Sequence, residues 1–168
     1  MSFAVQMAER ASRYAIFLGL ALLALTATLL APDFARPGNL ANLVIQSAVL
    51  AILAIGQTLV VTAGLIDLSV GTLMALATVL VSDLMQGQSW MTAPAILLAL
   101  AVGAAGGLLN GLLCNLLRVH PLILTFGMLS VFHGITLAYT ERSTGAASPE
   151  IIWFANGTLA GVPAILLL

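Results

Sequence analysis

The sequence predicts an all-α fold, a polytopic bundle of about five transmembrane helices followed by the start of a sixth. Of its 168 residues, 61% are hydrophobic and only 7% are charged, and the mean hydropathy is +1.15. A water-soluble domain carries far more charge on its surface. Turn-rich stretches also divide the chain into apolar runs near the length that a bilayer requires, about 20 residues. We therefore expect residues 1–168 to form a single transmembrane domain.

Five apolar runs account for the expected spans. They cover residues 14–31, 40–66, 68–82, 95–117 and 122–139, and a sixth helix is expected to begin at Pro163. The stretches "PDFARPGN", "DLMQGQSWMTAP", "RVHP" and "TERSTGAASPE" lie outside these runs and are rich in turn-forming and polar residues. Arg10 and Arg13 precede the first run, which by the positive-inside rule predicts a cytoplasmic N-terminus. Because the sixth run is short, we expect the chain to be the N-terminal part of a longer protein.

The second and third spans are separated by a predicted helix break near Asp67, within "TAGLIDLSVGTL" (62–73). A carboxylate in the middle of a bilayer costs roughly 3 kcal/mol on insertion scales unless it has partners. Gly64 loosens the preceding helix, Asp67 or Ser69 can cap the next one, and Gly71 leaves room for a close neighbour. Two interpretations stay open: Asp67 is only a helix cap, or the break also lines a translocation path.

The fourth span carries a ridge of small residues at every fourth position. The ridge consists of Ala95, Ala99, Gly103, Gly107 and Gly111. Residues four apart lie on one side of a helix, and small side chains allow another helix to approach closely. The sequence therefore predicts helix packing through Gly103, Gly107 and Gly111, either in a static bundle or in a helix that slides.

Several kinds of chemistry are excluded or disfavoured. The chain has no lysine, so it cannot form the phosphate-binding P-loop, which requires one. Two dispersed histidines, His120 and His133, are too few for a metal site, and no cofactor site is indicated. The net charge of −1 argues against a nucleic-acid partner. We expect no enzymatic activity and no catalytic residues.

The residues around Asp67 carry a resemblance to a known family. The run "AIGQTLVVTAGLIDLSVGTLMALA" (54–77) resembles the signature of ribose-type sugar ABC transporter permeases. That signature has two glycines where this chain has Gly64 and Leu65, and its Asp-Leu-Ser-Val-Gly matches residues 67–71. The blocks "GGLLNGLL" (106–113), "HPLILTFGMLSVFHGITLAYT" (120–140) and "FANGTLAGVPA" (154–164) agree in order. Residues 67–71 favour the sugar branch over branched-chain amino-acid permeases of related fold.

The resemblance implies a function and a set of partners. It implies a multi-pass subunit of the bacterial inner membrane that moves a monosaccharide, such as ribose or xylose, by alternating access. The implied partners are separate ABC ATPase subunits, a periplasmic sugar-binding protein, a second permease subunit and membrane lipid. Family members are about twice as long, so the chain is expected to be the N-terminal half. The alternatives are a non-transporting remnant or assembly partner, and a permease for another small solute such as a branched-chain amino acid or nucleoside.

A sugar path calls for neutral polar side chains inside the bundle. We expect six residues on the predicted helices to line such a path: Gln57, Thr58, Asn110, Thr125, Ser130 and His133. Each of them could instead make hydrogen bonds to a neighbouring helix, because lipid offers no partner for a polar group.

Overall fold

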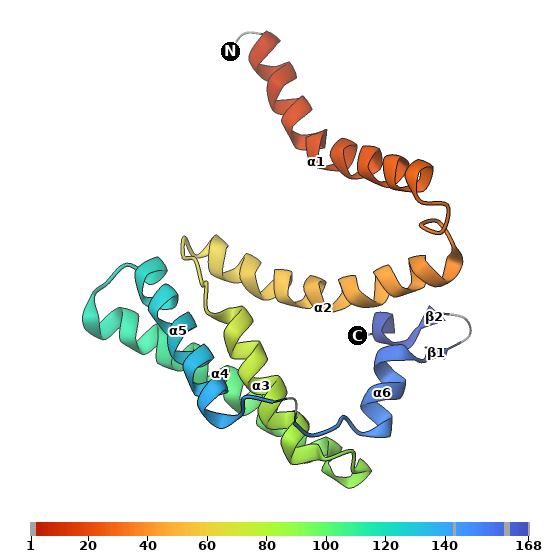
Figure 1. The fold of residues 1–168 in the computed structure, drawn as a ribbon. Coiled ribbons are helices and arrows are strands. Elements are labelled where there is room, and N and C mark those ends of the chain that lie inside the picture. The colour runs from red at the N-terminus through yellow and green to blue at the C-terminus, as the bar shows by residue number, and fades with distance from the viewer. Residues whose placement is uncertain (1–2, 143, 160–161, 168) are drawn as a thin grey trace. The chain divides into compact units, whose positions relative to one another are not determined.

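The computed structural model describes residues 3–142, 144–159 and 162–167 (Figure 1). The chain divides into two compact units, residues 1–46 and 47–168. The first unit contains α1 (Phe3–Leu30) and the beginning of α2 (Pro37–Thr62). Between these helices Arg36 forms an exposed ion pair with Asp33, at 2.8 Å. Pro37 starts α2, where the missing N–H of proline leaves no intrahelical bond unmade.

The second unit is built around α3 (Val70–Met85), which packs against α4 (Thr92–Leu117) and α5 (Pro121–Tyr139) (Figure 1). The start of α5 meets the start of α3, since Thr125 bonds to Ile66 and Leu68. At the other end, the Tyr139 hydroxyl donates a hydrogen bond to the Asp83 carboxylate. Helices α3 and α5 therefore run in the same direction.

A small apolar core joins these three helices. Leu76, Met128 and Phe132 are buried, and four partly buried leucines pack against them: Leu73, Leu80, Leu113 and Leu124. No described residue of α2 is buried within the chain. Apolar side chains on membrane helices need not be covered by the same chain, because lipid solvates them equally well. The small core and the exposed apolar helices are consistent with a membrane protein.

The loop at residues 144–148 is fastened to the end of α3. Ala146 N–H donates to Ser82 O at 3.1 Å, and Gly87 N–H donates to Ala146 O at 2.8 Å. Gly145 has φ +72, and a Cβ there would lie 2.0 Å from Ser82 O, so only glycine fits this close approach. After this loop, α6 (Pro149–Asn156) begins with Ser148 as its N-cap.

The chain after α6 differs from the sequence-based expectation. A helix was expected to start at Pro163, but Pro163 belongs to a two-stranded hairpin of β1 (Thr158–Leu159) and β2 (Val162–Pro163). One 3-10 helix (η2, Ala164–Leu167) follows, and another (η1, Ser89–Met91) precedes α4. The antiparallel pairing Leu159 with Val162 takes residues 162–163 out of any helix. Across the described residues the regular structure is helical apart from this short strand pair.

The expected number of about five spans is not confirmed. Among the described residues, three helices are long and apolar enough to cross a membrane: Pro37–Thr62, Ser89–Leu117 and Pro121–Tyr139. Two shorter apolar helices, Tyr14–Leu30 and Val70–Met85, are below that length. The predicted break between the second and third runs agrees with the structure, where α2 ends at Thr62 and α3 begins at Val70.

Candidate functional site at the helix break

Helix α2 ends in a Schellman motif centred on Gly64. The N–H of Leu65 donates to Val60 O at 3.1 Å, and the N–H of Gly64 donates to Val61 O at 2.9 Å. Gly64 has φ +76, the left-handed conformation that this motif requires and that costs other residues about 1–2 kcal/mol. Leu65 occupies the next position, where no positive φ is required. The replacement of the second signature glycine by Leu65 is therefore compatible with the turn.

The Asp67 carboxylate closes the other side of the break. Its Oδ1 accepts hydrogen bonds from the Ser69 N–H and from the Ser69 hydroxyl, each at 2.7 Å. Ser69 is the N-cap residue of α3 by position, but its side chain makes no bond to the first helical turn. Both bonds of Asp67 also go to Ser69 and not to the first turn of α3, so the predicted capping of α3 by the side chain of Asp67 or Ser69 is wrong. The two residues instead form a local turn directly before the helix.

Asn110 of α4 holds Ser69 from the side. Its Nδ2 donates to the Ser69 Oγ at 2.8 Å, and both residues are buried. Because the Ser69 hydroxyl proton is directed to Asp67, its oxygen acts as acceptor toward Asn110. The amide is therefore oriented with its nitrogen toward Ser69. Its oxygen, Asn110 Oδ1, is buried without a hydrogen-bond partner among the described residues.

Two further side chains bind the backbone of the break. Gln57 Nε2 on α2 donates to Asp67 O at 2.8 Å. Thr125 Oγ1 on α5 donates to Ile66 O and accepts from the Leu68 N–H, both at 3.2 Å. Three helices therefore contribute one polar side chain each to the same non-helical segment.

The structure separates the six expected path residues into two groups. Gln57, Asn110 and Thr125 meet at the break, where they bind the backbone of the chain or Ser69. Thr58 is exposed, and its hydroxyl donates a hydrogen bond to Ala54 O of the same helix at 2.7 Å. Ser130 and His133 are exposed on α5 and do not join this cluster.

Sequence reasoning missed the glycine that faces α3. A Cβ at Gly106 would lie 2.6 Å from Leu73 Cδ1, so α3 and α4 pack closely there. Gly106 precedes Asn110 by one helical turn, and this four-residue spacing was a signal that could have identified it. At Gly103, Gly107 and Gly111 no described atom lies within 4 Å of such a Cβ, and these three residues are exposed. Gly71 is exposed as well and has no close neighbour in this chain.

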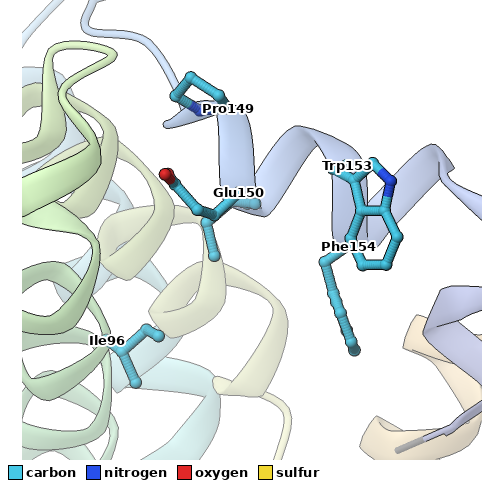
Figure 2. Close-up of a pocket in the computed structure, with 6 residues that line it drawn as sticks. Ile96, Pro149, Glu150, Trp153 and Phe154 are labelled. Carbon is cyan, nitrogen blue, oxygen red and sulfur yellow. The ribbon is translucent and has the colours of Figure 1, made fainter.

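A separate groove of about 840 Å³ lies between α4 and α6 (Figure 2). Figure 2 shows Ile96 of α4 on one side and Trp153 and Phe154 of α6 on the other. Its one charged lining residue is Glu150, whose pKa is lowered mainly by a hydrogen bond from the Ser89 side chain. Ile96 is about 21 Å from Asn110 along α4 at about 1.5 Å per residue, so this groove is distinct from the break.

Within the part of the chain that the structure describes, no group of three or more His, Cys, Asp or Glu side chains could hold a metal ion. The side chains at the break are two amides, two hydroxyls and the Asp67 carboxylate, which accepts a hydrogen bond from the Ser69 hydroxyl. They can make polar, non-covalent contacts within a largely apolar bundle.

Comparisons with known proteins agree with one another. Residues 39–167 match the family described as branched-chain amino acid transport system / permease component. The ribose import permease protein RbsC of Escherichia coli (strain K12) is 38% identical over 149 residues, which are 86% of this chain and 46% of the relative. RbsC of Bacillus subtilis (strain 168) is 37% identical over 151 residues, covering 88% and 46%. The fructose import permease protein FruF of Bifidobacterium longum is 37% identical over 134 residues, covering 76% and 37%.

The chain thus spans about half the length of the curated relatives it matches. The matched region contains the whole helix break and all of the side chains that bind it. No solved structure matched the chain.

Proposed function

This chain belongs to that permease family and, within it, to the ribose-type sugar permeases of ABC transporters, and on this premise we propose that it is a membrane-spanning subunit of a sugar importer. The proposed substrate is a monosaccharide of the ribose or xylose type, and the proposed mechanism is alternating access across the inner membrane. The observation that carries the proposal is the 38% identity to a ribose import permease across 86% of this chain.

The structure supports this proposal through the character of the break. Its polar groups are neutral amides and hydroxyls, apart from Asp67, whose Oδ1 is engaged by Ser69. A neutral, hydroxyl-rich solute needs such donors and acceptors rather than a charged site. Gln57, Asn110 and Thr125 are the residues nearest to a path at this point, and we propose Thr58, Ser130 and His133 as further path residues on exposed helix surfaces.

The energy source is proposed to lie in other subunits. The chain has no lysine, so it contains no P-loop of its own. We propose ABC ATPase subunits, a periplasmic sugar-binding protein and a second permease subunit as partners. The exposed Gly103, Gly107 and Gly111 surface of α4 is the proposed contact with a further helix, since small residues let helix backbones approach closely.

Uptake measurements test the proposal. Cells that lack their own ribose permease would produce this chain together with the ATPase and binding protein of a ribose importer, and radiolabelled D-ribose and D-xylose uptake would be followed. Uptake above that of cells without this chain is expected. Uptake of L-leucine or of a nucleoside instead would contradict the sugar assignment and support a permease for one of these alternative solutes. Stable membrane insertion without uptake of any of these solutes would contradict the transport proposal.

A further inference from the structure

The helix break lies inside the bundle rather than at its end. Asn110 and Thr125, which bind the break, mark its level on α4 and α5. Beyond this level α4 continues to Leu117 for about 10 Å and α5 extends back to Pro121 for about 6 Å, at about 1.5 Å per residue. The side chains in these two stretches are apolar apart from Asn115, and the first charged residue is Arg118.

The length of α3 independently indicates that the helix break lies inside the bundle. Its 16 residues reach about 24 Å, which is shorter than a hydrocarbon core of about 30 Å. Helix α3 alone therefore does not span such a core, and the non-helical residues 65–69 directly precede it. This segment sits at a depth where helices α4 and α5 are still continuous.

Residues 65–68 carry backbone donors that nothing in the described chain satisfies. The N–H groups of Leu65 and Leu68 are paired, with Val60 O and Thr125 Oγ1. The hydrogen bonds among the described residues include none from the N–H groups of Ile66 and Asp67. Ile66 is 46% exposed, so this residue lies at the surface of the chain and not in its core.

Lipid cannot cover such a surface, because each unpaired backbone group in hydrocarbon costs several kcal/mol. Irregular backbone at this depth occurs only where it is buried in protein or lines a water-filled cavity. We infer that residues 65–68 line a water-filled passage and that the Ile66 and Asp67 N–H groups donate hydrogen bonds to a neutral, hydroxyl-bearing solute there. The passage follows from the backbone alone, and the solute class rests on the proposed function.

Cysteine labelling tests the passage. Cys114 is the one cysteine in the sequence, so Cys114→Ala provides a background without thiols. Ile66→Cys, with Leu65→Cys as a second position, would be exposed in membrane vesicles of intact protein to a charged maleimide. Thiols react as thiolates, which require water, so both are expected to label about an order of magnitude faster than thiols in lipid.

Two control positions lie at the same depth on intact helices. Phe126 follows Thr125 on α5 and is 64% exposed, and Leu109 precedes Asn110 on α4 and is 45% exposed. Phe126→Cys and Leu109→Cys should label slowly. Full labelling of every variant after denaturation in detergent confirms that each protein was present. If Ile66→Cys and Leu65→Cys react no faster than these two controls, the segment is covered and the inference is wrong.

A second arm separates the passage from the solute. D-ribose is expected to slow labelling at Ile66→Cys, whereas L-leucine at the same concentration should not. Fast labelling that D-ribose does not slow would support the water-filled passage. It would contradict the proposed solute class, and with it the proposed function. Slow labelling at both test positions would contradict the passage whatever the uptake measurements show.

Discussion

Asn110 Nδ2 lies 2.8 Å from Ser69 Oγ, and this buried hydrogen bond joins the middle of α4 to the first residue before α3. The Ser69 hydroxyl in turn donates to Asp67 Oδ1 at 2.7 Å. The three side chains form a relay in which each group has a set direction, from amide to hydroxyl to carboxylate. Such a relay tolerates neither a lost donor nor a second negative charge.

Replacing the amide by a carboxylate tests this relay. Asn110→Asp removes the donor to Ser69 and brings a second acid next to the hydroxyl that Asp67 already uses. We expect a loss of about 3 kcal/mol or more in the free energy of unfolding at neutral pH, because an uncompensated buried charge costs that much. Unfolding in mixed micelles measures it. Asn156→Asp, at an exposed position on α6 and outside the three long apolar helices, is the control, and equal losses would contradict the relay.

Gly64 and Gly71 should respond differently to alanine. Gly64 has φ +76, so Gly64→Ala is expected to lower the free energy of unfolding by about 1–2 kcal/mol. Gly71 is helical with no atom within 4 Å of a Cβ, so Gly71→Ala should be neutral or slightly stabilising. Thermal unfolding in detergent compares the two. A larger loss for Gly71→Ala would mean that a partner helix packs there.

Thr125 is the link between α5 and the break. Thr125→Val keeps the shape but loses the bonds to Ile66 O and the Leu68 N–H, and should cost about 1 kcal/mol. Hydrogen exchange of the Leu68 amide should rise in this variant. Thr136→Val is matched, because Thr136 bonds only to Phe132 O of its own helix. Unchanged exchange at Leu68 would show that Thr125 does not hold the segment.

The contact between the 144–148 loop and α3 depends on Gly145. Gly145→Ala would place Cβ against Ser82 O and require a left-handed alanine, so the loop must leave α3. We expect rapid proteolysis in the loop and a marked fall in the melting temperature. Gly134→Ala, where nothing lies within 4 Å, should have neither effect. Resistance to protease equal to that of the unmodified protein would contradict the tight contact.

Protonation of Glu150 is expected to weaken the packing of α6 at the groove as the pH falls. The Ser89 hydrogen bond favours the charged carboxylate and lowers its pKa below 4.5, with Ser148 and Thr92 contributing less. This contribution to α6 docking is therefore present above pH 4.5 and lost as the pH falls through the lowered pKa. The fluorescence of Trp153 should report the change. Glu150→Gln should abolish the transition and Glu141→Gln should retain it; the reverse result would assign it elsewhere.

Local chemistry made the helix break predictable. At the end of α2 the Gly64 N–H donates to Val61 O and the Leu65 N–H donates to Val60 O, and Asp67 bonds to Ser69 two positions later. These interactions span a few residues and depend on residue types that are visible in the sequence. The apolar composition likewise predicts membrane helices, because a chain with so little charge cannot cover a water-exposed surface.

The sequence by itself determined that the chain is helical, suited to a membrane and interrupted between Thr62 and Val70. Only the tertiary structure decided that Asn110 and Thr125 meet the break while Ser130 and His133 do not, and that Gly106 rather than Gly107 faces Leu73. The physical reason is that lipid and protein interior are equally apolar, so hydrophobic periodicity does not indicate which side of a membrane helix faces its neighbours. The rotation of each helix is set by close packing and hydrogen bonds between distant residues.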